Sequence, residues 1–196
     1  MNYLSDAMFW LSNGLLVPVI AALLYLFVRA ILLLGMLFSS WQRHKSIRST
    51  MSLIMRGADK KNVQQLHEEL KKTPQKNSFF ITATRLFDST QETRVLLIGE
   101  FELLADKRLS SAEILAKFGP IVGLMGTLIP MGPALSGLAG GDIAGMSYNM
   151  QVAFATTVLG LFASAIGYIA IQITSRYNHQ LLLWLDYFNE RISSER

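Results

Sequence analysis

The sequence predicts an all-α integral membrane protein with three transmembrane helices, of which the second and third continue as long cytoplasmic helical extensions. Composition, three long apolar runs and an uneven distribution of basic residues predict this class. Of the 196 residues, 51% are hydrophobic and only 16% are charged, whereas a soluble domain carries about 25% charged residues. The charged residues also gather in a few segments, which is typical of a membrane protein with a polar domain on one side.

Each of the three apolar runs is longer than the roughly 20 residues that cross a hydrocarbon core. The N-terminus lacks the basic start of a signal peptide, so the first run is expected to remain as an anchor. The predicted segments follow in this order: external N-terminal segment 1–14, transmembrane helix 15–38, cytoplasmic helical region 39–111, transmembrane helix 112–138 with a cytoplasmic start, external loop 139–147, transmembrane helix 148–174 and cytoplasmic helical tail 175–196.

The basic residues predict the orientation in the membrane. Most of the 18 Lys and Arg residues lie between residues 39 and 111, while the N-terminal segment and the loop have none. By the positive-inside rule, we expect a multi-pass protein of the cytoplasmic (inner) membrane, with its N-terminus outside and its C-terminus in the cytoplasm. Arg29 is the exception. It is expected to reach a phosphate of the membrane lipids by snorkelling, and a functional ion pair is the alternative.

The cytoplasmic region is expected to be helical. The segment KKNVQQLHEELKK has apolar Val63, Leu66 and Leu70 at helical spacing, and Pro74 ends this pattern. From about Phe79 the chain is predicted to form one long helix that enters the second span directly.

Small residues follow one face of each of the last two spans. In lipid, such stripes mark close helix–helix contact, and contact alone is the simpler interpretation of them. The residues predicted to pack helices are Gly119, Gly123, Gly126, Gly160, Ser164 and Gly167.

Several polar side chains interrupt these spans. Thr127 and Thr157 are predicted at roughly the same depth, about 14–17 Å from the outer ends of their spans. They could therefore line a polar path, to which Thr156, Asn149 and Gln151 would contribute. The alternative is that each threonine hydroxyl bonds to a carbonyl of its own helix.

The spans lack several types of reactive side chain, and this limits the functions that the chain can perform alone. No carboxylate or histidine lies at this depth, so a proton path would need a titratable group from a partner. With no Cys and three scattered His residues, no metal ligands are predicted. We expect no catalytic residues, no cofactor and no nucleic-acid partner. The segment Gly140-Gly141-Asp142 predicts a plain turn.

Two motifs carry a family resemblance. GPIVGLMGTL, followed after a short loop by AFATTVLGLFASAIGYIAIQ, resembles the last two spans of the MotA/TolQ/ExbB proton-channel family, in its ExbB/TolQ branch. The predicted topology is similar throughout, and the motifs cover about residues 118–172. The resemblance implies a homopentamer around a dimer of single-span partners similar to ExbD, TolR or MotB. Such a partner carries an intramembrane Asp, and the complex uses the proton motive force for work at the cell envelope.

The resemblance also assigns residue roles. Thr127 of GLMGT and Thr157 of AFATTVLGL match the threonines that face the proton site in the family. Val152 stands where the ExbB pattern has a glutamate, and Pro130 and Pro133 have no counterpart expected there. These prolines are predicted to distort the second span, either widening the pore or freeing carbonyls. The departures leave H⁺ and Na⁺ open as the coupling ion. A structural membrane scaffold without ion conduction is the alternative function.

Overall fold

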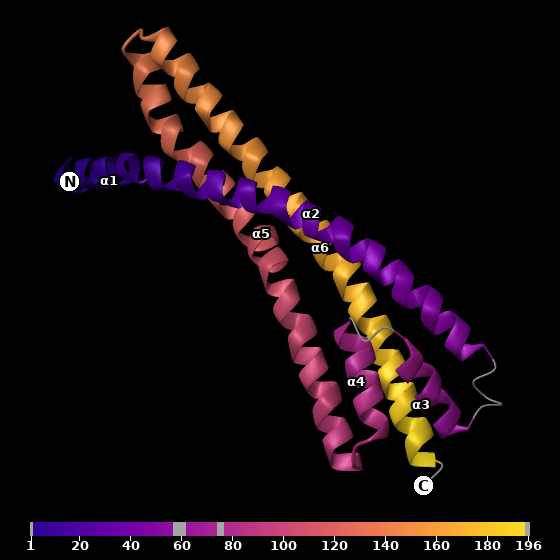
Figure 1. Cartoon of the computed structure of the whole chain (residues 1–196). Coiled ribbons are helices and arrows are strands. Elements are labelled where there is room, and N and C mark those ends of the chain that lie inside the picture. The colour runs from indigo at the N-terminus through magenta and orange to yellow at the C-terminus, as the bar shows by residue number, and fades with distance from the viewer. Residues whose placement is uncertain (1, 57–61, 74–76, 195–196) are drawn as a thin grey trace. The chain divides into compact units, whose positions relative to one another are not determined.

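The computed structural model describes residues 2–56, 62–73 and 77–194, and nearly all of them are helical (Figure 1). The all-α prediction is confirmed for the described part of the chain, which contains no strand. The helices are α1 Asn2–Gly14, α2 Leu16–Met55, α3 Val63–Lys72, α4 Ser78–Phe87, α5 Gln91–Ala139 and α6 Ile143–Ser194.

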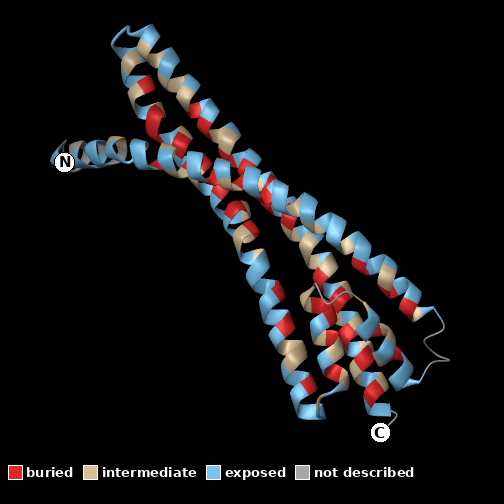
Figure 2. Ribbon diagram, in the orientation of Figure 1, coloured by how far each residue is buried: buried red, intermediate tan, exposed pale blue. Residues whose placement is uncertain are grey.

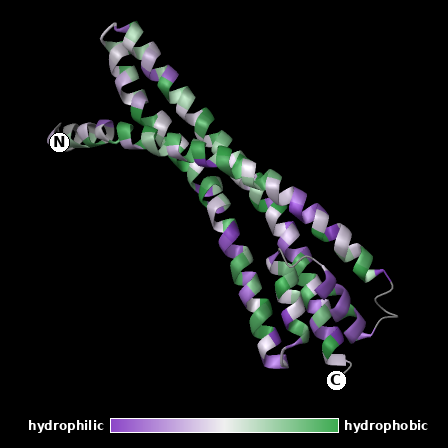
Figure 3. Ribbon diagram, viewed as in Figure 1, coloured by the Kyte–Doolittle hydropathy of each residue, from purple (hydrophilic) through white to green (hydrophobic). Residues whose placement is uncertain are grey.

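Three of these helices are long and apolar enough to cross a membrane, namely α2, α5 and α6. They contain the three predicted spans, and each continues well beyond its apolar part. Figure 3 shows the change along each of these helices from apolar residues to a more polar stretch. The chain is therefore a multi-pass membrane protein.

The chain folds as two compact units, which are described separately. The first, here called the apolar unit, comprises residues 1–36 and 111–171. The second, here called the polar unit, comprises residues 37–110 and 172–196. The apolar unit contains the candidate site, and the polar unit has its own hydrophobic core.

The N-terminal segment is helical up to its junction with the first span. Backbone hydrogen bonds from Leu15 N to Leu11 O and from Val19 N to Leu15 O run across the junction of α1 and α2. Pro18 lacks an N–H and so cannot contribute a further bond there. A helix that begins at Asn2 is long enough for the first span to start well before Leu15.

The predicted single helix from Phe79 into the second span is wrong. The structure ends α4 at Phe87 and begins α5 at Gln91. The residues between them are Asp, Ser and Thr, whose side chains compete with helical backbone bonds. The Ser89 hydroxyl donates to the carbonyl of Arg85 at 2.6 Å and so satisfies a carbonyl in the last turn of α4.

A tight turn joins α5 to α6. Gly141 has a φ of +78°, a left-handed conformation that favours glycine. The backbone N–H of Gly145 donates to Oδ1 of Asp142 at 2.9 Å, which caps the first turn of α6. The turn predicted for Gly140-Gly141-Asp142 is present, and α6 begins at Ile143, five residues before the predicted span at Tyr148.

The polar unit has an apolar core to which all its helices contribute. The predicted face of α3 turns inward, since Leu66 and Leu70 are completely buried and Val63 packs against the same core. Figure 2 shows the buried residues gathered on the facing sides of these helices. The other main contributors are Ile47, Met51, Ile54, Phe79, Phe80, Ala83, Leu86, Phe101, Leu181, Leu185, Phe188 and Ile192.

Candidate functional site

The backbones of α5 and α6 lie in direct contact within the apolar unit. A methyl group added at Gly119 would lie 2.7 Å from the carbonyl oxygen of Gly160. One added at Gly160 would lie 2.8 Å from Cα of Gly123. Such distances are shorter than van der Waals contact, so only glycine fits at these positions. Close backbone approach of this kind is how helices associate in lipid.

Glycines also permit close contact at the two ends of this crossing. A methyl group added at Gly126 would lie 2.6 Å from Cβ of Thr156. At the other end, one added at Gly167 would lie 2.7 Å from the carbonyl oxygen of Ala112. The predicted packing residues therefore lie along one continuous α5–α6 contact.

A hydrogen bond between the helices compensates for a proline. In an α-helix the N–H of residue 120 would donate to the carbonyl of Ala116. Pro120 has no N–H, so this carbonyl lacks its usual donor. The hydroxyl of Ser164 on α6 donates to this carbonyl at 3.0 Å. The sequence analysis assigned Ser164 to helix packing and did not identify this bond. The four-residue spacing between Ala116 and Pro120 was the signal that could have identified its acceptor.

Thr127 and Thr157 lie beside the same part of the α5–α6 contact. A methyl group added at Gly123 would lie 3.7 Å from the carbonyl oxygen of Thr157, and Gly126 faces Thr156. Thr127 directly follows Gly126, so the two threonines are at similar positions along the hairpin. Both are half-buried. One side of each remains open to whatever lies next to the hairpin.

Both threonine hydroxyls donate to carbonyls of their own helix. Thr127 Oγ1 donates to the carbonyl of Leu124 at 2.7 Å. Thr157 Oγ1 donates to the carbonyl of Ala153 at 3.2 Å. Because each hydroxyl oxygen keeps its lone pairs, each can still accept a hydrogen bond from water or from a hydrated ion.

Thr156 differs from its neighbour. It is 5% exposed, its side chain faces Gly126, and its hydroxyl donates to the carbonyl of Ala153 at 2.8 Å. The structure thus places Thr156 inside the α5–α6 contact, apart from the open side of Thr157.

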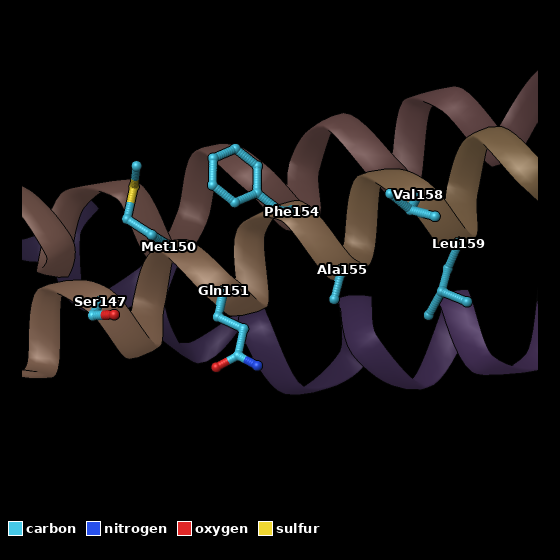
Figure 4. A pocket seen from close by; sticks show the side chains of 7 residues that line it. All are labelled: Ser147, Met150, Gln151, Phe154, Ala155, Val158 and Leu159. Carbon is cyan, nitrogen blue, oxygen red and sulfur yellow. The ribbon is translucent and has the colours of Figure 1, made fainter.

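Asn149 and Gln151 lie nearer the turn and have different surroundings. The amide of Asn149 donates to the carbonyl of Gly145 at 2.9 Å, within α6. Gln151 is exposed and lies on an open groove along one face of α6 (Figure 4). Its amide and the Ser147 hydroxyl are polar groups in an otherwise apolar lining. Ser147 was not predicted as a site residue.

Pro130 and Pro133 lie inside α5, which stays helical through both of them. Pro130 is fully buried. The neighbouring residue Ile129 packs in a small core with Val19 and Leu23 of α2. Since neither proline has an N–H, the carbonyls four residues earlier on α5 lack their usual donors. Freed carbonyls, one of the two effects predicted for these prolines, therefore follow from a helix that continues through both of them.

Arg29 has polar partners within the apolar unit. Its guanidinium donates to the hydroxyl of Tyr25 at 2.7 Å and to the hydroxyl of Ser111 at 2.9 Å. Both partners are neutral, so the positive charge is not compensated by these bonds. The sequence analysis missed Tyr25 and Ser111. The four-residue spacing from Tyr25 to Arg29 could have indicated the first contact.

The side chains at the hairpin can line a path but cannot release protons near pH 7. Between residues 118 and 174, Asp142 in the turn is the one carboxylate, and there is no histidine. In the part of the chain that the structure describes, no cluster of His, Cys, Asp or Glu could hold a metal ion. The site therefore offers hydroxyl and amide groups, which can bind water or a hydrated ion.

Comparison with known families identifies the class of protein. The model of the MotA/TolQ/ExbB proton channel family matches residues 43–186, which include the α5–α6 hairpin and most of the apolar core of the polar unit. The chain belongs to the MotA/TolQ/ExbB proton channel family. Searches of curated proteins and of solved structures give no match.

Proposed function

We propose that this chain is the channel subunit of an ion-driven, energy-transducing complex of the inner membrane. Five copies surround a dimer of single-span partners similar to ExbD, TolR or MotB. Proton flow between the subunit and the partner then does work at the cell envelope. The family match supports a channel of this type, and the three apolar helices suit a multi-pass subunit.

The position of Thr127 and Thr157 is the observation that carries the proposal. They flank one part of the α5–α6 contact, and both keep an open side. A hydroxyl in this position can accept a hydrogen bond from water or from a protonated carboxyl group, and so it can guide a proton without titrating itself. Gln151 and Asn149 extend the polar lining toward the turn.

The partner has to supply the titratable group. Residues 118–174 of this chain have no carboxylate outside the turn, and a proton relay in a membrane normally needs one. An intramembrane Asp on the partner meets this need. In the proposed topology, the polar unit and the C-terminal tail lie in the cytoplasm and the turn at Asp142 lies outside.

One observation favours the alternative, a scaffold that does not conduct ions. Both threonine hydroxyls already donate to their own helices, and the glycines account for tight helix packing. A scaffold needs nothing more than these contacts.

Proton flux through the complex of this chain and its partner, reconstituted in liposomes, distinguishes the two functions. Thr127→Val and Thr157→Val remove the hydroxyls and keep the shape of the side chain. We expect each variant to lower the proton flux at least about tenfold. This corresponds to a barrier to proton transfer that is about 1.4 kcal/mol higher without the hydroxyl. Thr127→Ser and Thr157→Ser keep the hydroxyl and are expected to conduct.

Thr156→Val serves as a matched control, because it removes the hydroxyl of a neighbour that is buried against Gly126, away from the open side of Thr157. Unchanged flux in the double variant Thr127→Val/Thr157→Val would show that these threonines do not line the path. Absence of any gradient-dependent flux in the native complex would favour the scaffold.

A further inference from the structure

Two exposed helix faces of the polar unit carry opposite charges. One, here called the basic face, lies on the last part of α2 and on Arg56, which directly follows this helix. The other, here called the acidic face, lies on the first part of α5. Spacings of three and four residues keep each set on one side of its helix. The basic face consists of Trp41, Lys45, Arg48, Ser52 and Arg56, and the acidic face of Glu92, Val95, Gly99, Glu102, Leu103 and Asp106.

In the described part of the chain, no recorded ion pair involves the charges of either face. Residues 37–56 contain no Asp or Glu. The ion pairs recorded among the described residues are His67–Asp88, Lys72–Glu68 and Lys117–Glu113, none of which involves either face. Two surfaces of opposite sign are therefore available to a partner.

Each face also exposes large apolar side chains. Trp41 on the basic face is 56% exposed, and on the acidic face Val95 is 64% and Leu103 is 72% exposed. These residues lie in the polar unit, outside the predicted spans. Exposed apolar groups with a charged rim are typical of a protein–protein contact, and Trp and Arg often dominate its energy.

Gly99 marks the middle of the acidic face. A methyl group added there would meet nothing within 4 Å, so no contact with the described residues requires a glycine. In the middle of a water-exposed helix, glycine costs about 1 kcal/mol relative to alanine. The absence of a side chain lets another helix approach the backbone of α5 closely at this point.

The charges of the two faces have similar spacings along their helices. They are counted here from the two bounds of the polar unit, Leu37 on α2 and Ser110 on α5. Lys45 lies eight residues from the first of these points (45 − 37), and Glu102 lies eight from the second (110 − 102).

The match continues at the far ends of both faces. Arg56 and Glu92 lie 19 and 18 residues from the same two points (56 − 37 and 110 − 92). At a rise of about 1.5 Å per residue, such differences are small. Opposite charges therefore have similar spacings and can pair when the basic face of one copy lies against the acidic face of another.

We propose that the basic face of one copy docks on the acidic face of the next copy, so that identical chains assemble head to tail through their polar units. This inference rests on the proposed homo-oligomer and adds the surfaces that join its subunits. An interface between two different faces is heterologous and closes into a ring when the rotation per subunit permits. A second copy suits both faces, whereas an anionic lipid surface would repel the acidic one.

Cysteine cross-linking tests whether the two faces meet. The native chain has no cysteine, so every disulfide must come from an introduced residue. Ser52 and Val95 each lie 15 residues from the two bounds of the polar unit (52 − 37 and 110 − 95), and both are exposed. Under oxidation in native membranes, Ser52→Cys/Val95→Cys is expected to give a ladder of cross-linked species that ends at the ring size. Each single variant is expected to give no ladder. The off-level pair Ser52→Cys/Asp106→Cys is the matched control and should cross-link poorly.

Charge reversal tests the electrostatic part of the pairing. In the same double-cysteine chain, Lys45→Glu or Glu102→Lys should weaken the association about tenfold, equivalent to about 1.4 kcal/mol. The combination of both reversals should restore the ladder. Both residues are exposed, so circular dichroism should be unchanged in all three variants.

Other outcomes overturn the inference. Disulfide dimers from Val95→Cys alone would indicate that α5 meets α5. An oligomeric native mass without cross-links between positions 52 and 95 would reject these faces and leave the proposed channel function standing. A monomeric native mass in the membrane complex would overturn both this inference and the proposed homo-oligomer.

Discussion

At the scale of single residues, two adjacent threonines have different environments. Thr156 is buried against Gly126 of α5, whereas Thr157 keeps one side open. Neighbouring positions on a helix differ by about 100° in direction, so only one of the two can face the partner helix. The sequence placed both among the polar lining residues. The backbone contact at Gly126 shows which threonine packs inside the hairpin.

Another residue whose environment matters is His44 in the polar unit. Its ring stacks on the ring of Tyr177, with centroids 4.1 Å apart and an angle of 6° between the planes. Burial lowers the pKa of His44, and the nearby Arg108 and Arg43 lower it further. The folded protein therefore favours the neutral imidazole at this position.

This histidine predicts how stability depends on pH. Because the pKa of His44 is lower in the folded than in the unfolded state, its contribution is present above about pH 6.5 and is lost as the pH falls. Thermal unfolding in detergent should show a decrease in melting temperature between pH 7.5 and 5 that is smaller in His44→Gln. His179→Gln, which changes an exposed histidine, is the matched control. An equal decrease in the native chain and in His44→Gln would contradict the assignment.

At the scale of elements, the α5–α6 hairpin shows why glycine and proline suit a membrane helix. Glycines bring the two backbones into contact. The hydroxyl of Ser164 then reaches the carbonyl that Pro120 leaves without its usual donor. An unmade backbone bond is costly in lipid, so this compensation should be measurable.

A double-mutant cycle tests the Ser164–Pro120 link. Ser164→Ala is expected to destabilise the hairpin by about 0.6 kcal/mol, the average for such bonds between membrane helices, and by no more than about 1.7 kcal/mol. In a Pro120→Ala background the loss should be smaller, because the new N–H can donate to Ala116. Unfolding in detergent measures both values, with Ser136→Ala, an exposed serine on α5, as the control. Equal losses in both backgrounds would show that the two residues are not coupled.

The elements also show what the sequence could predict. Long apolar runs identify the three spans, because length and hydrophobicity alone decide whether a helix can cross lipid. The face of α3 followed from the spacing of Leu66 and Leu70. The break between α4 and α5 could not be found by tracing apolar periodicity, since it depends on short polar side chains that bond to the local backbone. The bond from Ser164 to Ala116 depends on how two helices meet, which no local pattern contains.

At the scale of the whole molecule, the chain combines hydroxyl and amide groups at the hairpin, where the turn holds the one carboxylate, with two oppositely charged faces on the polar unit. In the proposed complex, a single-span partner completes the path and further copies of the chain cover the charged faces of the polar unit. Function should therefore depend on assembly, and the isolated chain should not transport protons.

The most direct test of this account is proton uptake by liposomes that contain the chain alone, the chain with its partner, or the chain with a partner whose intramembrane Asp is changed to Asn. We predict gradient-dependent uptake only for the complex with the native partner, since the carboxylate supplies the titratable group that residues 118–174 lack. Equal uptake by the chain alone, or by the complex with the Asn variant, would contradict the central claim that this chain lines a path whose proton-carrying group belongs to its partner.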